Sequence, residues 1–196
     1  METTFAATIE KWNLLNHPFY QAWSNGTLPA GKLKEYAADY GAFISTIGKG
    51  WTTAGEAAIA DEENEHFKMW QNFASTLGVT EISANAQEVK TLVNLSTENY
   101  HRYSTALGAL LAFEAQQPHT TASKKEGLTR FYAQLNADET YFDVHMHDDH
   151  EAELLLQKIS KLSSEEQQEA LIACEQTCEA LWNALSGIMG EDACMN

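Results

Sequence analysis

Five acidic and histidine side chains in this sequence have the types and spacing of metal ligands. Glu63 and His66 form a Glu-x-x-His pair, which one turn of a helix brings to a single face. Bundles that bind two iron ions use this spacing to present two ligands to one site. Glu114, His145 and Asp149 follow further along the chain. Mixed carboxylate and imidazole ligands suit iron(II) or manganese better than a metal that prefers thiolates.

Each of these residues interrupts an apolar stripe of helical period. The stripes are Ile59, Glu63, His66, Trp70, Phe73, Leu77; Leu107, Leu110, Leu111, Glu114; and Phe142, His145, Asp149, Ala152, Leu156, Ile159. No lysine, arginine or cysteine lies on them. Because a buried ionised carboxylate needs a counter-charge, the absence of bases favours a divalent metal, and the absence of cysteine argues against structural zinc.

A structural role also fits each residue taken alone. A single Glu-x-x-His pair is a weak signal, the histidine-rich run 145–151 could be a solvated helix face, and Glu114 could lie at the surface. Only their coincidence on three stripes makes the metal interpretation as strong as the structural one.

Helices are the elements that would position these stripes. Apolar residues make up 44% of the 196 residues, and three prolines leave long stretches free to be helical. We expect helical segments at about 4–15, 30–47, 51–77, 84–115, 123–135, 137–162 and 163–189. Ser163 and Glu166 form a capping box, and Gly78, Gly187 and Gly190 act as terminators. The sequence predicts one all-α domain over residues 1–196, a bundle of about seven helices.

Charge and composition limit the partners. The net charge of −16 repels phosphate backbones, so nucleic acid is not expected as a partner. No apolar run reaches the roughly 18 residues of a membrane span, and the first residues do not resemble a secretion signal. Cys174, Cys178 and Cys194 have no disulfide-framework spacing, which fits a reducing cytoplasm. A homodimer is left open.

Several stretches resemble the TenA/PqqC/CADD-like superfamily, which has the heme-oxygenase-like fold, and especially its branch of iron-containing di-iron oxidases. These stretches are 17–20 (HPFY) with 26–28, 66–73 (HFKMWQNF) with 77–79, 109–118 (ALLAFEAQQP), 141–145 (YFDVH) and 181–188. The likeness covers nearly the whole chain. It is most specific around Glu114 and His145.

The resemblance implies one or two iron ions, with manganese as an alternative. The implied ligands are the five that the stripes select: Glu63, His66, Glu114, His145 and Asp149. Related proteins commonly place another histidine three residues after the aspartate, where this chain has Ala152. The connection before His66 is shorter than in many members, so Glu62 is an alternative to Glu63.

The resemblance further implies a non-heme iron oxidase or oxygenase that activates dioxygen on a small organic substrate. In this interpretation the carboxylates balance the metal's charge, and the histidines set its geometry and potential. Tyr141 could be redox-active, although packing is the favoured role. Related enzymes oxidise fatty acids, amino acids or part of the protein itself, so the substrate is open.

Two further functions are alternatives. One is a TenA-like, metal-independent hydrolase of thiamin-type compounds with a cysteine nucleophile, although Cys174 and Cys178 fit helix packing better. PqqC-like oxidation without a metal needs several bases, in which this chain is poor. The other alternative is a non-catalytic helical binding module with a degenerate metal site, which Ala152 favours.

Overall fold

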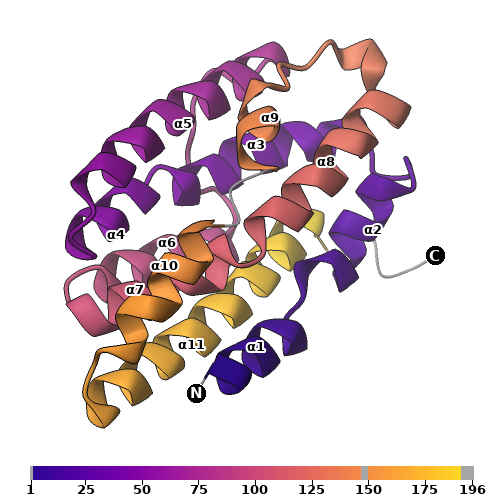
Figure 1. Cartoon of the computed structure of the whole chain (residues 1–196). Coiled ribbons are helices and arrows are strands. Elements are labelled where there is room, and N and C mark those ends of the chain that lie inside the picture. Colours follow the sequence, from indigo (N-terminus) through magenta and orange to yellow (C-terminus); the bar gives the residue numbers. More distant parts are fainter. Residues whose placement is uncertain (1, 147–149, 191–196) are drawn as a thin grey trace.

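All regular secondary structure is helical in the computed structural model, which describes residues 2–146 and 150–190 (Figure 1). The α-helices are α1 (Glu2–Lys11), α2 (Pro18–Ser24), α3 (Ala30–Ile44), α4 (Ile47–Thr53), α5 (Ala57–Thr76), α6 (Gln87–Asn99), α7 (Tyr103–Glu114), α8 (Gln117–Phe131), α9 (Thr140–His145), α10 (His150–Ser160) and α11 (Ser164–Met189). Short 3₁₀ turns lie at Leu14–Asn16 and Ala133–Leu135. The predicted all-α class is confirmed.

The helices are more numerous than the predicted seven because turns divide the long segments. Gly55, at φ +81°, separates α4 from α5 within the segment predicted at 51–77. Pro18 opens α2, a helix that lies between the segments predicted at 4–15 and 30–47, at a position where its missing N–H has no intrahelical role. Gly187 lies inside α11, so its predicted role as a terminator is wrong. The capping box of Ser163 and Glu166 is confirmed.

Helix α7 lies at the centre of the packing that carries the candidate site. It contacts α4, α6, α10 and α11, and its residues from Ala106 to Glu114 are buried. A Cβ at Gly108 would collide with the carbonyl oxygen of Ala170, so glycine permits the close approach of α7 to α11. Packing on every side explains why the apolar character of α7 runs around the whole helix.

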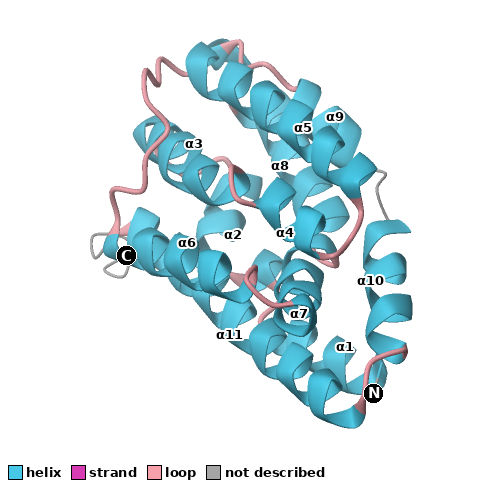
Figure 2. Cartoon of the chain, turned by 90° about the vertical axis from the view of Figure 1, so that its left-hand side faces the viewer, coloured by secondary structure: helices cyan, strands magenta, loops and turns pink. Residues whose placement is uncertain are grey.

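The other helices of the site surround α7 and α5. Helix α9 packs against α5 and α8, and α10 packs against α7. Figure 2 shows α10 beside α7 and α9 beside α5. Segments that are far apart in the sequence therefore approach one another here, as a site built from several stripes requires.

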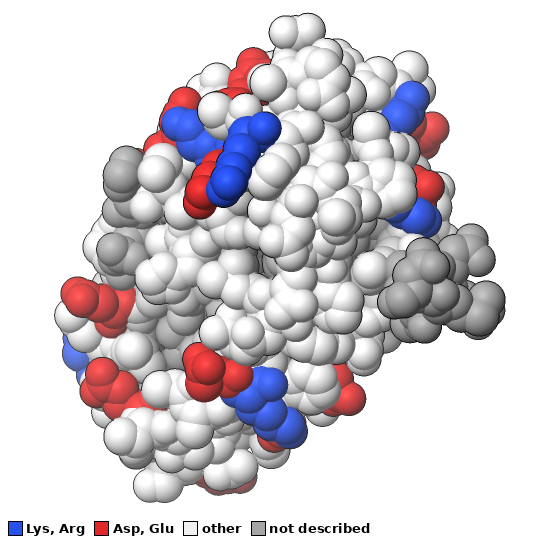
Figure 3. Space-filling model, turned by 90° about the vertical axis from the view of Figure 1, so that its right-hand side faces the viewer, with Lys and Arg blue, Asp and Glu red and all other residues white. Residues whose placement is uncertain are grey.

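Charged side chains are spread over the surface, although the chain as a whole is acidic. On the face in Figure 3, acidic and basic residues lie near one another around a broad area of uncharged residues. Within residues 2–146 and 150–190, no helix is both long enough and apolar enough to cross a bilayer.

His17 gives the fold a testable dependence on pH. The side chain is buried, its Nδ1 accepts the N–H of Phe19 at 3.0 Å, and its Nε2 lies 2.9 Å from the hydroxyl of Ser186. Burial lowers the pKa of His17 from 6.5 to about 4. Between these values the unfolded chain binds a proton that the folded chain does not, so the free energy of unfolding falls as the pH drops from 6.5 to 4.

We expect the free energy of unfolding of His17→Asn to fall by roughly 2 kcal/mol less than that of the wild type over this pH range. Solvent screening makes the effect smaller than the full pKa shift implies. Asparagine keeps an acceptor at the start of α2 but does not titrate. Urea unfolding of both proteins at pH 7, 5.5 and 4.5 measures the difference. Equal pH slopes for the two proteins would show that His17 is not the titrating group.

Candidate metal centre

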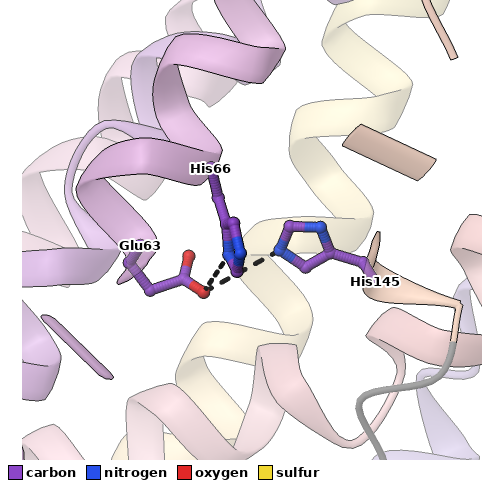
Figure 4. Close-up of side chains that lie close together, drawn as sticks. All are labelled: Glu63, His66 and His145. Carbon is purple, nitrogen blue, oxygen red and sulfur yellow. Dashed lines mark hydrogen bonds and ion pairs between the residues drawn. The ribbon is translucent and has the colours of Figure 1, made fainter. Parts of the chain in front are cut away.

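Glu63, His66 and His145 form a compact cluster between α5 and α9. One potential ligand atom from each lies within 4.8 Å of the others. Figure 4 shows the two imidazoles directed towards the same oxygen of Glu63. His66 Nδ1 is 2.9 Å from Glu63 Oε1, His145 Nε2 is 3.8 Å from it, and the two ring centroids are 4.4 Å apart. The Glu-x-x-His pair and the distant histidine therefore meet at one place.

His145 has the orientation of a metal ligand. Its Nδ1 lies 2.8 Å from the backbone carbonyl of Tyr141, and since a carbonyl only accepts, Nδ1 carries the proton. Nε2 of the neutral ring then holds a lone pair, yet it is buried without a hydrogen-bond partner in the described part of the chain. A carbonyl that fixes one ring nitrogen so that the other faces an ion is a common feature of histidine ligands. This orphaned nitrogen fits a divalent metal.

Glu63 is held as a carboxylate in this environment. Its side chain is 3% exposed. Burial by itself would raise the pKa of Glu63, but the adjacent His145 and His66 imidazoles, when protonated, outweigh it and lower the pKa to about 2. An acid that stays ionised beside two imidazoles is a suitable anionic ligand for a cation.

Glu114 lies in a second, more acidic part of the same region. It is 2% exposed, and its Oε1 accepts a hydrogen bond from Trp51 Nε1 at 3.0 Å. Burial first, and then the charges of Glu151 and Glu63, raise the pKa of Glu114 well above its usual value. Buried carboxylates that repel one another must be neutralised, either by a proton that they share or by a cation that binds between them.

The predicted site residues differ in where the structure places them. It brings together Glu63, His66 and His145, and the charge of Glu63 acts on the nearby Glu114. Glu62 is exposed, so the alternative in which it replaces Glu63 does not fit. The predicted ligand Asp149 lies outside the described residues.

The third apolar stripe is corrected beyond residue 149. The sequence pattern continued it through Ala152 and Leu156, but the buried face of α10 consists of Glu151, Leu155 and Ile159. The stripe assumed one continuous helix over 137–162, whereas α9 ends at His145 and α10 begins at His150. Two separate helices need not keep a common phase, so the inward positions 151 and 155 lie one residue before the predicted 152 and 156, whereas Ile159 is buried as predicted.

Sequence reasoning missed three residues at or near the centre: Trp51, Glu151 and Lys124. Glu151 stands four residues before Leu155 and eight before Ile159, a spacing that could have identified it. Lys124 shares such a spacing with Leu128 and Thr121. Trp51 gives no sequence signal for its contact with Glu114, because the two residues are 63 positions apart.

Lys124 is buried in an aromatic cluster next to the metal-ligand candidates. Its ammonium nitrogen lies 3.5 Å from the hydroxyl of Tyr36 and 5.7 to 6.0 Å from four ring centroids. The four rings belong to Tyr20, Tyr36, Tyr40 and Phe142. Burial lowers the pKa of Lys124 to about 7, so it can lose its proton near neutral pH.

Tyr141 connects the aromatic cluster to the metal-ligand candidates. Its ring stacks on His145 with centroids 4.1 Å apart, and its hydroxyl accepts a hydrogen bond from Gln117 Nε2 at 2.7 Å. Burial, followed by the charges of Glu63 and Glu114, raises the pKa of Tyr141 well above its usual value. Tyr141 therefore remains a neutral phenol whose ring and backbone both orient His145.

The all-helical fold and the cluster of Glu63, His66 and His145 are those of a helical protein that could bind a metal ion. The comparison with known families agrees with this class. A family model described as an iron-containing redox enzyme matches residues 44–182, a span that includes all five predicted ligands. The chain belongs to this heme-oxygenase-like family of iron-containing redox enzymes.

Two relatives match almost the whole chain and are named 4-aminobenzoate synthase. The one from Nitrosomonas europaea is 29% identical and covers 96% of this chain and 90% of its own length. The one from Chlamydia muridarum is 26% identical and covers 96% of this chain and 89% of its own.

Two solved structures share the fold. A TenA homologue from Pseudomonas syringae pv. tomato superimposes with a TM-score of 0.72 at 17% identity, over 95% of this chain and 88% of the homologue. A CADD-like protein of unknown function from Nostoc punctiforme gives 0.58 at 13% identity, over 97% and 96%. The resemblance to the TenA/PqqC/CADD-like superfamily is confirmed.

Proposed function

We propose that this chain is an iron-dependent oxidase or oxygenase that uses dioxygen to oxidise a small organic molecule. The observation that carries the proposal is the buried, unpartnered Nε2 of His145 beside the ionised Glu63 and the imidazole of His66. Glu63, His66, Glu114, His145 and Asp149 would hold the metal. Bound there, iron would supply the ability to bind and reduce dioxygen, which no protein side chain provides.

The chain's own residues would control the charge and orientation of the site. Glu63 and Glu114 offer anionic oxygens, and the backbone carbonyl of Tyr141 fixes the ring of His145. Trp51 holds one oxygen of Glu114 through its indole N–H. The packed rings of Trp70 and Tyr141, with centroids 4.8 Å apart, help to exclude water from this side.

The relatives suggest 4-aminobenzoate as the product. A cavity of about 350 Å³ lies between α1, α7, α8 and α10, and it is large enough for a small aromatic molecule. Its wall includes Leu111 and Ala115, which flank Glu114 along the chain, and Ala152, which follows Glu151. We infer that this cavity leads small, largely apolar molecules towards the carboxylates.

Iron loading followed by product analysis tests the proposal. The protein is loaded with iron(II) without oxygen and desalted. It is then exposed to dioxygen together with a reductant and a low-molecular-mass cell extract as the source of substrate, while oxygen uptake and 4-aminobenzoate are measured against the extract without protein. We expect one to two tightly bound iron ions per chain, oxygen uptake and formation of 4-aminobenzoate. A chain that retains neither iron nor manganese would overturn the oxidase proposal. Metal and oxygen uptake without 4-aminobenzoate would overturn the product alone.

The cysteine-dependent alternative gains no support from the described cysteines. Cys174 and Cys178 are both buried in α11. A hydrogen bond with Cys178, and then burial, raise the pKa of the Cys174 thiol far above its usual value. A nucleophilic cysteine needs the opposite, a lowered pKa and access to the substrate. Cys194 lies outside the described residues.

A further inference from the structure

We propose that Glu151 is an additional metal ligand, and that it replaces from α10 the histidine that related proteins carry at the position of Ala152. The inference rests on the proposed function, since it requires that the chain binds iron or manganese. It assigns a site role to a residue that lies outside the three predicted stripes and outside the ligand set that the family likeness implies.

The register of α10 supports this assignment. Glu151 is 4% exposed and shares the buried face of the helix with Leu155 and Ile159. Ala152, rotated by about 100° from Glu151 on the helix, is half-buried and lines the cavity of about 350 Å³ together with Leu156. A histidine at 152 would enter that cavity, whereas the side chain at 151 is directed into the protein.

The neighbour of Glu151 is itself a candidate ligand. A hydrogen bond between the carboxyl groups of Glu114 and Glu151, and the repulsion that arises when both are ionised, raise the pKa of Glu114. Two acids in contact at 4% and 2% exposure are unfavourable in a core that serves only packing.

An independent observation, the buried Nε2 of His145, also supports a cation in this region. His145 is 1% exposed, and its Nε2 lacks a hydrogen-bond partner among the described residues while lying 3.8 Å from Glu63. The charge of Glu63 also acts on Glu114, so the acidic pair lies in the electrostatic neighbourhood of the histidine cluster. A cation between them would satisfy the nitrogen and neutralise the carboxylates together.

Metal binding, measured without reference to activity, tests Glu151. We would compare the wild type with Glu151→Gln and with Glu153→Gln, which removes an exposed acid from the same turn of α10. Manganese(II) binding is followed by titration calorimetry and by the electron paramagnetic resonance signal of the bound ion. We expect Glu151→Gln to weaken binding by at least about tenfold and to change the bound-ion signal. Glu153→Gln should remain within about twofold of the wild type.

A double variant separates the two positions. Because residue 152 faces the cavity, adding Ala152→His to Glu151→Gln should not restore the affinity. Restoration would show that position 152 reaches the metal, which overturns the inference. Glu151→Asp keeps the charge on a shorter side chain, so it serves as a second test of ligation if the glutamine variant folds poorly.

The outcomes also separate this inference from the proposed function. Wild-type protein that binds neither iron nor manganese would overturn the proposed function and the ligand role together. Wild-type protein that binds metal, with an unchanged affinity and signal in Glu151→Gln, would overturn only the role of Glu151.

Discussion

Replacing His145 by glutamine should remove most of the tightly bound iron and, with it, the oxygen-dependent activity. The substitution deletes the one nitrogen that is buried without a hydrogen-bond partner among the described residues and lies near Glu63. Loss of a residue that only supports a ligand lowers metal affinity about 10- to 100-fold, so loss of a ligand should lower it by about 100-fold or more. Iron content after desalting and the rate of oxygen uptake measure the two effects.

The matched control for this experiment is Glu62→Gln, which alters an exposed acid next to Glu63 and should leave iron content unchanged. Glu63→Gln should resemble His145→Gln, and the double variant should lose little more than either one, because residues that act on one ion are not additive. Circular dichroism establishes that each variant is folded. A folded His145→Gln protein with the iron content of the wild type would refute the assignment.

Replacing Lys124 by methionine should stabilise the protein by about 2–4 kcal/mol at pH 7, which corresponds to roughly 5–15 °C in melting temperature. The physical reason is the burial of an ammonium group that is 1% exposed among aromatic rings and that forms no ion pair with a described carboxylate. Methionine fills a similar volume without a charge to desolvate. Thermal and urea unfolding of both proteins measure the difference.

The effect should depend on pH in a defined direction. The pKa of Lys124 is about 7 in the folded chain and about 10.5 in the unfolded chain. Between these values the unfolded chain binds more protons, so the wild type becomes more stable as the pH rises. The advantage of Lys124→Met should therefore shrink from pH 7 to pH 9, a range below the ionisation of exposed tyrosines.

Lys125→Met is the control for this second substitution. Lys125 is partly exposed and pairs with Asp143 on the surface, so its removal should change the free energy of unfolding far less than the removal of Lys124. If Lys124→Met destabilises the protein at every pH, the charge of Lys124 is well solvated or paired, and its low pKa is wrong. A stabilised variant would show that the chain keeps Lys124 for a reason other than stability.

Much of the local structure and part of the site could be predicted from sequence because they depend on neighbouring residues. The capping box at Ser163 requires only residues three apart, and the pairing of Glu63 with His66 requires only one helical turn. The positions of the breaks were harder to predict, since Gly55 divides a strongly periodic segment and Gly187 does not end α11. Packing of long neighbouring helices decides whether a glycine ends a helix.

The sequence by itself therefore determined the all-helical class, the inward faces of α5 and α7, and the identity of the acids and imidazoles on them. Only the tertiary structure decided that His145 meets Glu63, that Trp51 holds Glu114, and that Glu151 rather than residue 152 turns inward on α10. The physical reason is range. Helical periodicity fixes which side of a helix is apolar, whereas contacts between helices depend on the phase and packing of segments that are distant in the chain.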